Sequence, residues 1–276
     1  MRDNPWLSFL LVAPALLLVV ALFVYPLGFS LVTSFTGESG WTLANFTKAY
    51  DFYSQDILFT VLIIGIATVL IGVASVAIGG YLTLGETPWA VAALRWLYRW
   101  PLFIPFIVAA QLMRTFLAKN GMMNNVLVAG GILDPLQTMS FLDWRGIVIT
   151  FVWKQTPFVA LLVAGAMASL DRSTIEAARN LGAGRLRILI EILIPQVQQT
   201  IAVGLILSFV IMMSVLSVPL MINAQTPTLL TVDMSFRINS YGDYGVANAL
   251  GFISYLMTSV VAWVYLRQGV RQGGAP

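Results

Sequence analysis

The sequence predicts an all-α integral membrane protein with six membrane-spanning helices. Apolar residues make up 59% of its 276 residues and charged residues only 10%, and the mean hydropathy is +0.86. Soluble domains usually carry about 25% charged residues. A membrane-spanning helix needs roughly 17 to 25 mostly apolar residues. The six stretches of suitable length and composition are Leu7–Phe35, Ile57–Leu84, Pro101–Leu117, Gly146–Leu170, Val197–Ile222 and Tyr244–Leu266.

The composition excludes most enzyme classes. The chain has no cysteine and no histidine, which removes disulfides, thiolate nucleophiles, histidine metal sites and histidine acid–base chemistry. We therefore expect no catalytic residue and no metal site. The net charge of +3 is too small for a nucleic-acid footprint, so we expect no nucleic-acid partner. A membrane channel or a membrane enzyme is the alternative class, but an enzyme needs clustered ionisable groups that the sequence lacks.

The first two spans carry mainly structural signals. The first is long and lacks a small-residue cleavage site, so we expect it to stay as a membrane anchor. The aromatic residues of the following external loop, such as Trp41 and Tyr53, either lie at the headgroup boundary or dock an external partner. Glycines recur at near seven-residue spacing at Gly65, Gly72 and Gly79, which predicts a close-packing face.

The third and fourth spans carry polar residues at membrane depth. The segment WLYRWPLFIPF predicts a membrane entry followed by a kinked helix. Gln111 and Arg114 lie one turn apart near the far end of the third span, where Arg114 either serves transport or snorkels to the interface. Lys154 and Gln155 stand beside Pro157, where polar groups either satisfy the freed backbone or line a water-filled path.

The last two spans add further polar candidates. Serines and an asparagine near the end of the fifth span suit a path lining and are equally ordinary in a helix bundle. An aspartate at the start of the sixth span could stand at the mouth of such a path. The full set of translocation-path candidates is Gln111, Arg114, Lys154, Gln155, Ser214, Ser217, Asn223 and Asp243.

Basic residues set the orientation. Nine of the twelve arginines fall on the side of the N-terminus, and all three lysines fall on the other side. We therefore expect both termini in the cytoplasm, together with the polar stretch Asp171–Pro195. The nine arginines are Arg2, Arg95, Arg99, Arg172, Arg179, Arg185, Arg187, Arg267 and Arg271.

This polar stretch has the pattern of a helix, a bend and a second helix. Ser173 and Glu176 have the spacing of a capping box, which predicts a helix from Thr174 to Leu181. Gly182 follows where a C-terminal glycine allows a positive φ. Residues Ala183–Ile194 then predict the second helix. A protein that only crossed lipid would not need such an element.

The stretch resembles the EAA loop of ABC-importer permeases, written E-A-A, three residues, G, nine residues, I-x-L-P. Glu176, Ala177 and Ala178 match the first three positions, Gly182 matches the glycine, and the stretch ends ILIP at Pro195. One conservative departure is Ile194 in place of leucine. The resemblance implies a single permease domain over residues 1–276, with residues 171–195 as its coupling loop between spans four and five.

The resemblance also implies how the protein is driven. The loop would form a coupling helix that docks on a cytoplasmic ATPase dimer. The chain itself has no G-x-x-x-x-G-K-[ST] loop, so we expect no cofactor on it, and ATP and Mg²⁺ on the ATPase. The residues implied in coupling are Glu176, Ala177, Ala178, Arg179, Gly182, Ala183, Arg185 and Pro195.

The chain would form half of the membrane domain of a type I importer in the bacterial inner membrane. Its partners would be a second permease subunit, as a paralogue or a second copy, and an extracytoplasmic solute-binding protein. The run EAARNLGA looks more like spermidine/putrescine-type permeases than the E-A-A-x-I-D-G-A of maltose-type permeases. We therefore expect a polyamine-like solute carried by alternating access, with a sugar as the alternative. Arg114 and Lys154 would instead favour an anion, so the charge of the solute stays open.

Overall fold

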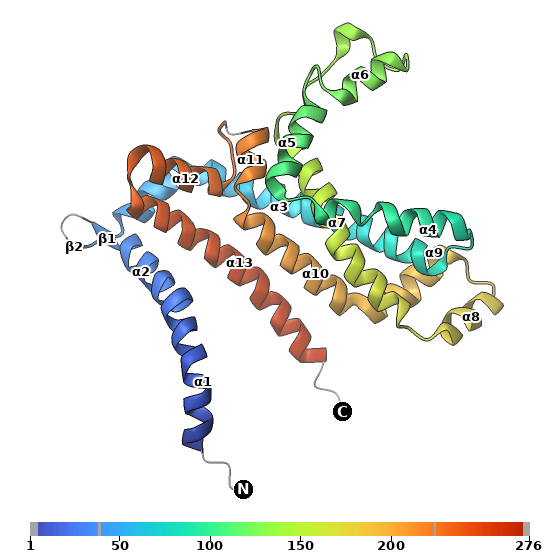
Figure 1. The fold of residues 1–276 in the computed structure, drawn as a ribbon, viewed down its shortest axis with the longest axis horizontal. Coiled ribbons are helices and arrows are strands. Elements are labelled where there is room, and N and C mark those ends of the chain that lie inside the picture. The colour runs from blue at the N-terminus through green and yellow to red at the C-terminus, as the bar shows by residue number, and fades with distance from the viewer. Residues whose placement is uncertain (1–4, 38–39, 224, 273–276) are drawn as a thin grey trace. The chain divides into compact units, whose positions relative to one another are not determined.

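The computed structural model describes residues 5–37, 40–223 and 225–272, which are almost entirely helical (Figure 1). The chain divides into two compact units. The first comprises Met1–Gln55 and Asp233–Leu256, and the second comprises Asp56–Val232 and Met257–Pro276. Each unit is described below by itself. The prediction of a single permease domain stays a prediction.

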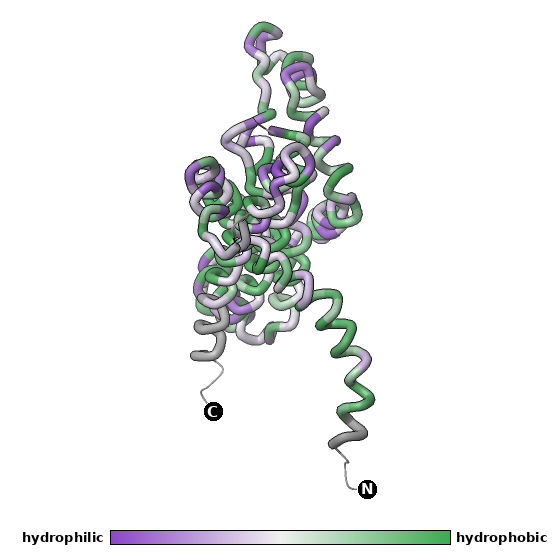
Figure 2. Tube along the Cα trace, turned by 90° about the vertical axis from the view of Figure 1, so that its left-hand side faces the viewer, coloured by the Kyte–Doolittle hydropathy of each residue, from purple (hydrophilic) through white to green (hydrophobic). Residues whose placement is uncertain are grey.

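The first unit begins with an uninterrupted helical run. It comprises α1 (Pro5–Val19), a π-helical turn (Val20–Val24) and α2 (Tyr25–Ser34). The apolar side chains of this run are exposed within the chain, and Figure 2 shows it as hydrophobic along almost all of its described length. Exposure of this many apolar groups is stable only against lipid or another protein. This supports the expected role of the segment as a membrane anchor.

The rest of the first unit packs around aromatic and polar contacts. A hairpin of β1 (Thr36–Gly37) and β2 (Gly40–Trp41) follows α2, in antiparallel register with Thr36 opposite Trp41. The unit also holds the start of α3 (Ala44–Leu84), most of α12 (Leu230–Tyr241) and the first part of α13 (Tyr244–Gln272). The Ser30 hydroxyl donates to Asn248 Oδ1 at 2.8 Å, which ties α2 to α13.

The second unit contains the remaining helices in chain order. The rest of α3 leads to α4 (Pro88–Leu97), a 3-10 turn (Trp100–Phe103), α5 (Phe106–Leu117), α6 (Met122–Ala129) and a 3-10 turn (Pro135–Gln137). Then come α7 (Trp144–Ala168), α8 (Arg172–Asn180), α9 (Arg185–Ile188), a π-helical turn (Leu189–Leu193), α10 (Ile194–Ser214) and α11 (Ser217–Ile222).

The core of the second unit is built around α7. This helix packs on α10, α5 and α11, and Phe151 and Val163 on it are fully buried. Gly204 allows α10 to approach α7 closely. A Cβ at this position would stand only 3.2 Å from Val159 Cγ1, which is tighter than an ordinary van der Waals contact. The predicted packing face of α3 is confirmed at Gly72 and Gly79, whereas a Cβ on Gly65 would meet nothing within 4 Å.

A buried carboxylate anchors the chain between α11 and α12. Asp56 on α3 is 2% exposed, and its Oδ1 accepts a 2.7 Å hydrogen bond from the backbone N–H of Thr228. One turn later, Thr60 Oγ1 accepts from the N–H of Leu230 at 3.1 Å. Backbone groups without a regular helical partner are thereby satisfied, which explains a buried acid in an apolar helix.

The described residues contain five helices long and apolar enough to cross a membrane, and a sixth if one bent pair counts as a span. That pair, Pro88–Phe103 and Phe106–Ala129, is bent by 109°, which agrees with the kink predicted for this segment, but the helices on both sides extend beyond the predicted span Pro101–Leu117. Pro101 and Pro105 explain the break, because neither provides a backbone N–H. The number of true spans stays a prediction.

The fifth span and two loops also differ from expectation. The predicted second helix of the polar stretch and the predicted fifth span form one candidate span, Arg185–Ser214. The chain then breaks before α11, because Val215 is extended with a ψ of 117°. The external loops expected between spans contain helix, since α3 already begins at Ala44 and α12 covers most of the last loop.

Candidate functional site

The helix α8 begins at a side-chain cap. Asp171 is the N-cap residue, and its carboxylate accepts hydrogen bonds from the Ser173 N–H at 2.9 Å and the Ser173 hydroxyl at 2.6 Å. These two bonds lower the pKa of Asp171 below its usual value. The predicted capping box of Ser173 and Glu176 is therefore wrong, because Asp171 already occupies the capping position. The helix starts two residues earlier than expected, at Arg172.

One face of α8 packs against the hydrophobic core of the second unit, and the opposite face is exposed. Ile175 is buried and joins the hydrophobic core, and Ala178 packs against that core. Arg179 Nη2 donates to the carbonyl of Leu84 at 3.4 Å. The side chain of Glu176 is exposed and makes no hydrogen bond or ion pair with any described residue. Its carboxylate is therefore available to another protein.

The C-terminus of α8 is a Schellman motif. Gly182 has a φ of +80°, its N–H donates to Arg179 at 2.8 Å, and the N–H of Ala183 donates to Ala178 at 3.0 Å. Ala178 and Ala183 also pack against the same core, which supplies the apolar contact common to this motif. The predicted glycine bend is confirmed, and it fixes the direction in which the chain leaves α8.

A substitution at Gly182 tests the need for this bend. We expect Gly182→Ala to destabilise the turn by about 1 to 2 kcal/mol, because a Cβ disfavours positive φ. A Cβ there would meet nothing within 4 Å, so sterics with neighbours add nothing. Gly184→Ala is the matched control, since Gly184 has a φ of −70° and equally open surroundings. Faster amide exchange across α8 in the first variant alone is the expected measurement, and equal exchange in the two would contradict it.

The segment after the bend is fastened to the end of α3. Arg185 forms an ion pair with Glu86, which lies just beyond α3, and Arg187 Nε lies 2.9 Å from Glu191 Oε2. Ile188 is 1% exposed, and a Cβ on Gly80 of α3 would come within 2.8 Å of Leu189 Cδ1. Pro195 lies inside the continuous helical run Arg185–Ser214, directly after the π-helical turn Leu189–Leu193, whose wider turn accommodates a residue without an N–H. A force on α8 can therefore pass directly into α3 and α10.

The structure brings most of the path candidates onto helices that pack together. Gln111 and Arg114 lie on α5, Lys154 and Gln155 on α7, and Ser217 on α11, and these three helices contact one another. Ser214 and Asn223 flank α11, at the end of α10 and just beyond α11. Asp243 lies in the first unit instead, where its carboxylate is 3.3 Å from Arg237 Nη1.

Lys154 is a buried cation without a carboxylate. It is 6% exposed, its Nζ donates to the Leu102 carbonyl at 3.4 Å, and the same atom lies 5.0 Å from the centre of the Phe106 ring. Among the residues that the structure describes, no acid pairs with it. An ammonium has three donors, so two of them are free for a further acceptor. Burying a charged side chain in a membrane helix costs free energy, so such a residue is a functional candidate by default.

Three buried polar side chains of α7 and α10 form a second set of candidates. Gln155 Nε2, Thr156 Oγ1 and Ser208 Oγ are buried and have no hydrogen-bond partner in the described part of the chain. Ser208 was not a candidate from the sequence. The signal that points to it is the four-residue spacing from Gly204, which places it on the face of α10 that packs against α7. Gln111, Arg114 and Ser214 are exposed, and Ser214 bonds only to its own helix.

The sequence matches a known protein family and is similar to several transport proteins. Residues 75–269 match a family described as binding-protein-dependent transport system inner membrane component. The chain is 27% identical to the sulfoquinovosyl glycerol transport system permease protein SmoG of Agrobacterium fabrum (strain C58), over 95% of this chain and 89% of SmoG. It is 28% identical to the spermidine/putrescine transport system permease protein PotB of Escherichia coli (strain K12), over 60% of each chain.

A solved structure has the same fold. The alginate ABC transporter, crystallised with its alginate pentasaccharide-bound periplasmic protein, contains a chain that superposes with a TM-score of 0.83. The alignment covers 99% of this chain and 97% of that chain, at 19% sequence identity. At that identity the likeness supports the arrangement of helices and no more.

Proposed function

Because the chain belongs to the family of binding-protein-dependent transport system inner membrane components, we propose that it forms half of the translocation path of an ATP-driven importer. Members of this family are permease subunits, so the chain is a non-catalytic subunit of the transporter and ATP is hydrolysed by a partner ATPase. The chain lies in the membrane, with several apolar helices long enough to cross it. A self-sufficient channel would have no use for an element like α8.

The observation that carries the proposal is the geometry of α8. It is capped at Asp171, bent at Gly182 and packed through Ile175, while Glu176 stays exposed and unpaired among the described residues. We propose that this helix, with the coupling residues named above, docks on one subunit of an ATPase dimer. A compact and well-fastened helix can transmit closure of that dimer as a rigid-body movement. ATP and Mg²⁺ would then be bound by the ATPase and not by this chain.

This docking requires α8 to lie in the cytoplasm. The distribution of basic residues supports that orientation, with both termini on the same side. Arg2, one of the residues counted, lies outside the described part of the chain. A second permease subunit would complete the path, and an extracytoplasmic solute-binding protein would deliver the solute from the other side.

For the solute, we propose a sugar or glycoside in place of the polyamine expected from the sequence. The relative named for a sulfoquinovosyl glycerol transport system matches along 95% of this chain, whereas the spermidine/putrescine relative matches along 60%. The charges agree with this choice. A polyamine path needs free carboxylates, but Asp56 is bonded to Thr228 and Asp243 is paired with Arg237. The buried cation Lys154 would instead repel a polyamine.

Uptake into proteoliposomes tests this proposal. The complete complex, including the ATPase and the solute-binding protein of the same transporter, is given labelled glycosides or labelled spermidine. We expect glycoside uptake that requires both ATP and the binding protein, and no spermidine uptake above the empty-liposome background. Spermidine uptake alone would contradict the proposed solute. Uptake without ATP would contradict the permease role itself and favour a channel.

A further inference from the structure

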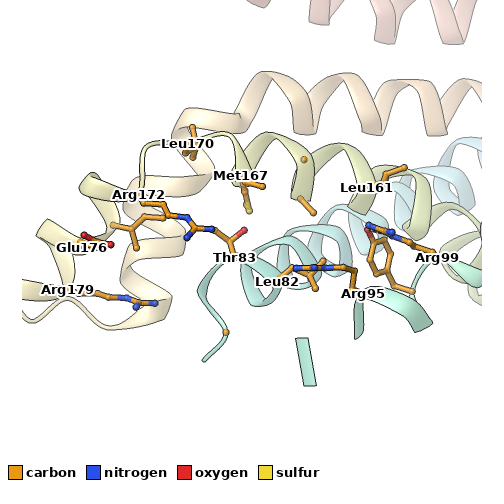
Figure 3. Close-up of a pocket in the computed structure, with 16 residues that line it drawn as sticks. Leu82, Thr83, Arg95, Arg99, Leu161, Met167, Leu170, Arg172, Glu176 and Arg179 are labelled. Carbon is orange, nitrogen blue, oxygen red and sulfur yellow. Dashed lines mark hydrogen bonds between the residues drawn. The ribbon is translucent and has the colours of Figure 1, made fainter. Parts of the chain in front are cut away.

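An arginine-rich cavity of about 640 Å³ opens beside α8 within the second unit. Residues near the ends of α3 and α7 form part of its wall, and α4 and α8 face it from two sides. Figure 3 shows Arg172 and Arg179 of α8 extending across this space toward Arg95 of α4 and toward Arg99, which precedes the 3-10 turn Trp100–Phe103. The positive-inside pattern explains the presence of arginines near a membrane surface, but it does not require them to converge.

The cavity carries an uncompensated positive charge. Its lining contains four arginines and a single carboxylate, Glu176, which gives a formal charge of +3. None of the four forms an ion pair with a described residue. Arg99 Nε donates to the Tyr98 hydroxyl at 3.2 Å, and Arg179 to a backbone carbonyl, so most of the guanidinium donors are unused. Such an arrangement favours an anion with several acceptor oxygens.

A second, apolar groove of about 440 Å³ adjoins the cavity and shares Arg95 and Arg99 with it. Its other walls include Trp96, Trp100 and Phe103, whose side chains are all exposed. The rings of Trp96 and Trp100 are 4.4 Å apart between centres. The two arginines therefore stand between a cationic cavity and an aromatic groove. A ligand that fits both is an anion with an apolar tail.

We propose that this cavity binds the phosphate of an acidic phospholipid. Guanidinium groups bind phosphate through paired hydrogen bonds, which favours a phosphate ester over a simple carboxylate. The acyl chains would lie along the Trp96, Trp100 and Phe103 groove, in the region where aromatic side chains meet a membrane interface. Because Arg172 and Arg179 belong to α8, the bound lipid would also brace the helix that we propose to dock on the ATPase.

Native mass spectrometry of the complete complex from nanodiscs tests this site. The discs contain phosphatidylcholine with phosphatidylglycerol, and the readout is the phosphatidylglycerol retained, which does not depend on transport or on its solute. We expect Arg95→Gln/Arg99→Gln to weaken retention by about tenfold or more, since two basic contacts to the anionic headgroup are lost. Arg187→Gln is the matched control. Arg187 lies on α9, shortly after α8 in the sequence, but it lines neither the cavity nor the groove. It should retain lipid like the wild type.

Further measurements distinguish lipid binding from misfolding, from binding of a free anion and from contact with the ATPase. Arg95→Lys/Arg99→Lys keeps the charge but loses the paired hydrogen bonds, so it should retain more lipid than the Gln double variant and less than the wild type, which distinguishes weaker binding from misfolding. Equal retention by the Gln double variant and the wild type would overturn the proposal. Displacement of the lipid by millimolar inorganic phosphate would also overturn it, and would assign the cavity to a free anion. Retention only after removal of the ATPase would assign it to an acidic surface of that partner.

Discussion

Glu176→Lys is expected to reduce ATP-driven uptake by roughly 100-fold while the chain still inserts and assembles. Glu176 is exposed on α8 and pairs with no described residue, so its reversal costs the isolated chain little. At a docked interface, however, the new cation would meet whatever group the carboxylate had bound. Like charges placed together at an interface cost several kcal/mol, and about 2.7 kcal/mol corresponds to 100-fold. Uptake and stimulated ATP hydrolysis by proteoliposomes are the measurements.

A second charge reversal in the same loop serves as the control. Glu191 is also exposed, and it is ion-paired with Arg187 on the turn that follows α9. Glu191→Lys breaks an exposed ion pair that contributes at most about 1 kcal/mol. We expect its uptake to stay within a few-fold of the wild type. Unaltered uptake by the Glu176 variant, or an equal loss in both variants, would remove the specific role given to Glu176.

Lys154→Gln is expected to lower uptake by about 10- to 100-fold without disturbing assembly. A hydrogen bond from a charged donor contributes about 1.5 to 3 kcal/mol, and the ammonium of Lys154 has donors to spare for a solute. The substitution removes the charge but keeps a polar side chain of similar size with two N–H donors. The expected loss therefore lies in solute recognition. Lys154→Arg, which keeps the charge, should retain more uptake than Lys154→Gln.

The control for charge alone is Lys119→Gln. Lys119 is exposed between α5 and α6, and its neutralisation should leave uptake unchanged. Complex assembly is measured by size-exclusion chromatography. It shows whether Lys154 contributes to solute transport or only stabilises the structure by its hydrogen bond to Leu102 in the 3-10 turn. Normal uptake by Lys154→Gln, or loss of the assembled complex, would contradict a recognition role for Lys154.

The features that the sequence predicted well are those that local chemistry dictates. Gly182 was expected to take a positive φ from its position after a helix, and it does. The apolar stretches correspond to long helices because their length and composition leave few alternatives. The spacing from Glu176 to Pro195 identified the family that the wider comparison then supported.

The features that were missed depend on competition between nearby groups or on distant contacts. Asp171 replaced Ser173 as the helix cap because both residues offer an acceptor and the carboxylate is the stronger one. Pro105 breaks the third span, but sequence alone does not give the size of the bend. The second helix, predicted to end at Ile194, instead continues through Pro195 into the fifth span, because the π-helical turn Leu189–Leu193 accommodates the proline.

The sequence could identify individual candidate residues, but it could not show which of them lie together in the fold. Arg95 and Arg99 are more than 70 residues from Arg172 and Arg179 in the sequence, and only the fold makes them face one cavity. Ser208 and Gln155 likewise become notable only because α7 and α10 pack closely enough to bury them unpaired. The solute expectation rested on a short run around Asn180, which is too few residues to outweigh the similarity along most of the chain.

The docking of α8 on an ATPase is tested most directly by cross-linking from Glu176→Cys. The chain has no native cysteine, so a single introduced thiol reports one position. In the assembled transporter we predict a cross-link from this thiol to the ATPase, and none from a matched Lys119→Cys variant, which we place on the other side of the membrane. Labelling of the Glu176→Cys thiol by a membrane-impermeant maleimide added outside intact cells, with no ATPase cross-link, would contradict the account.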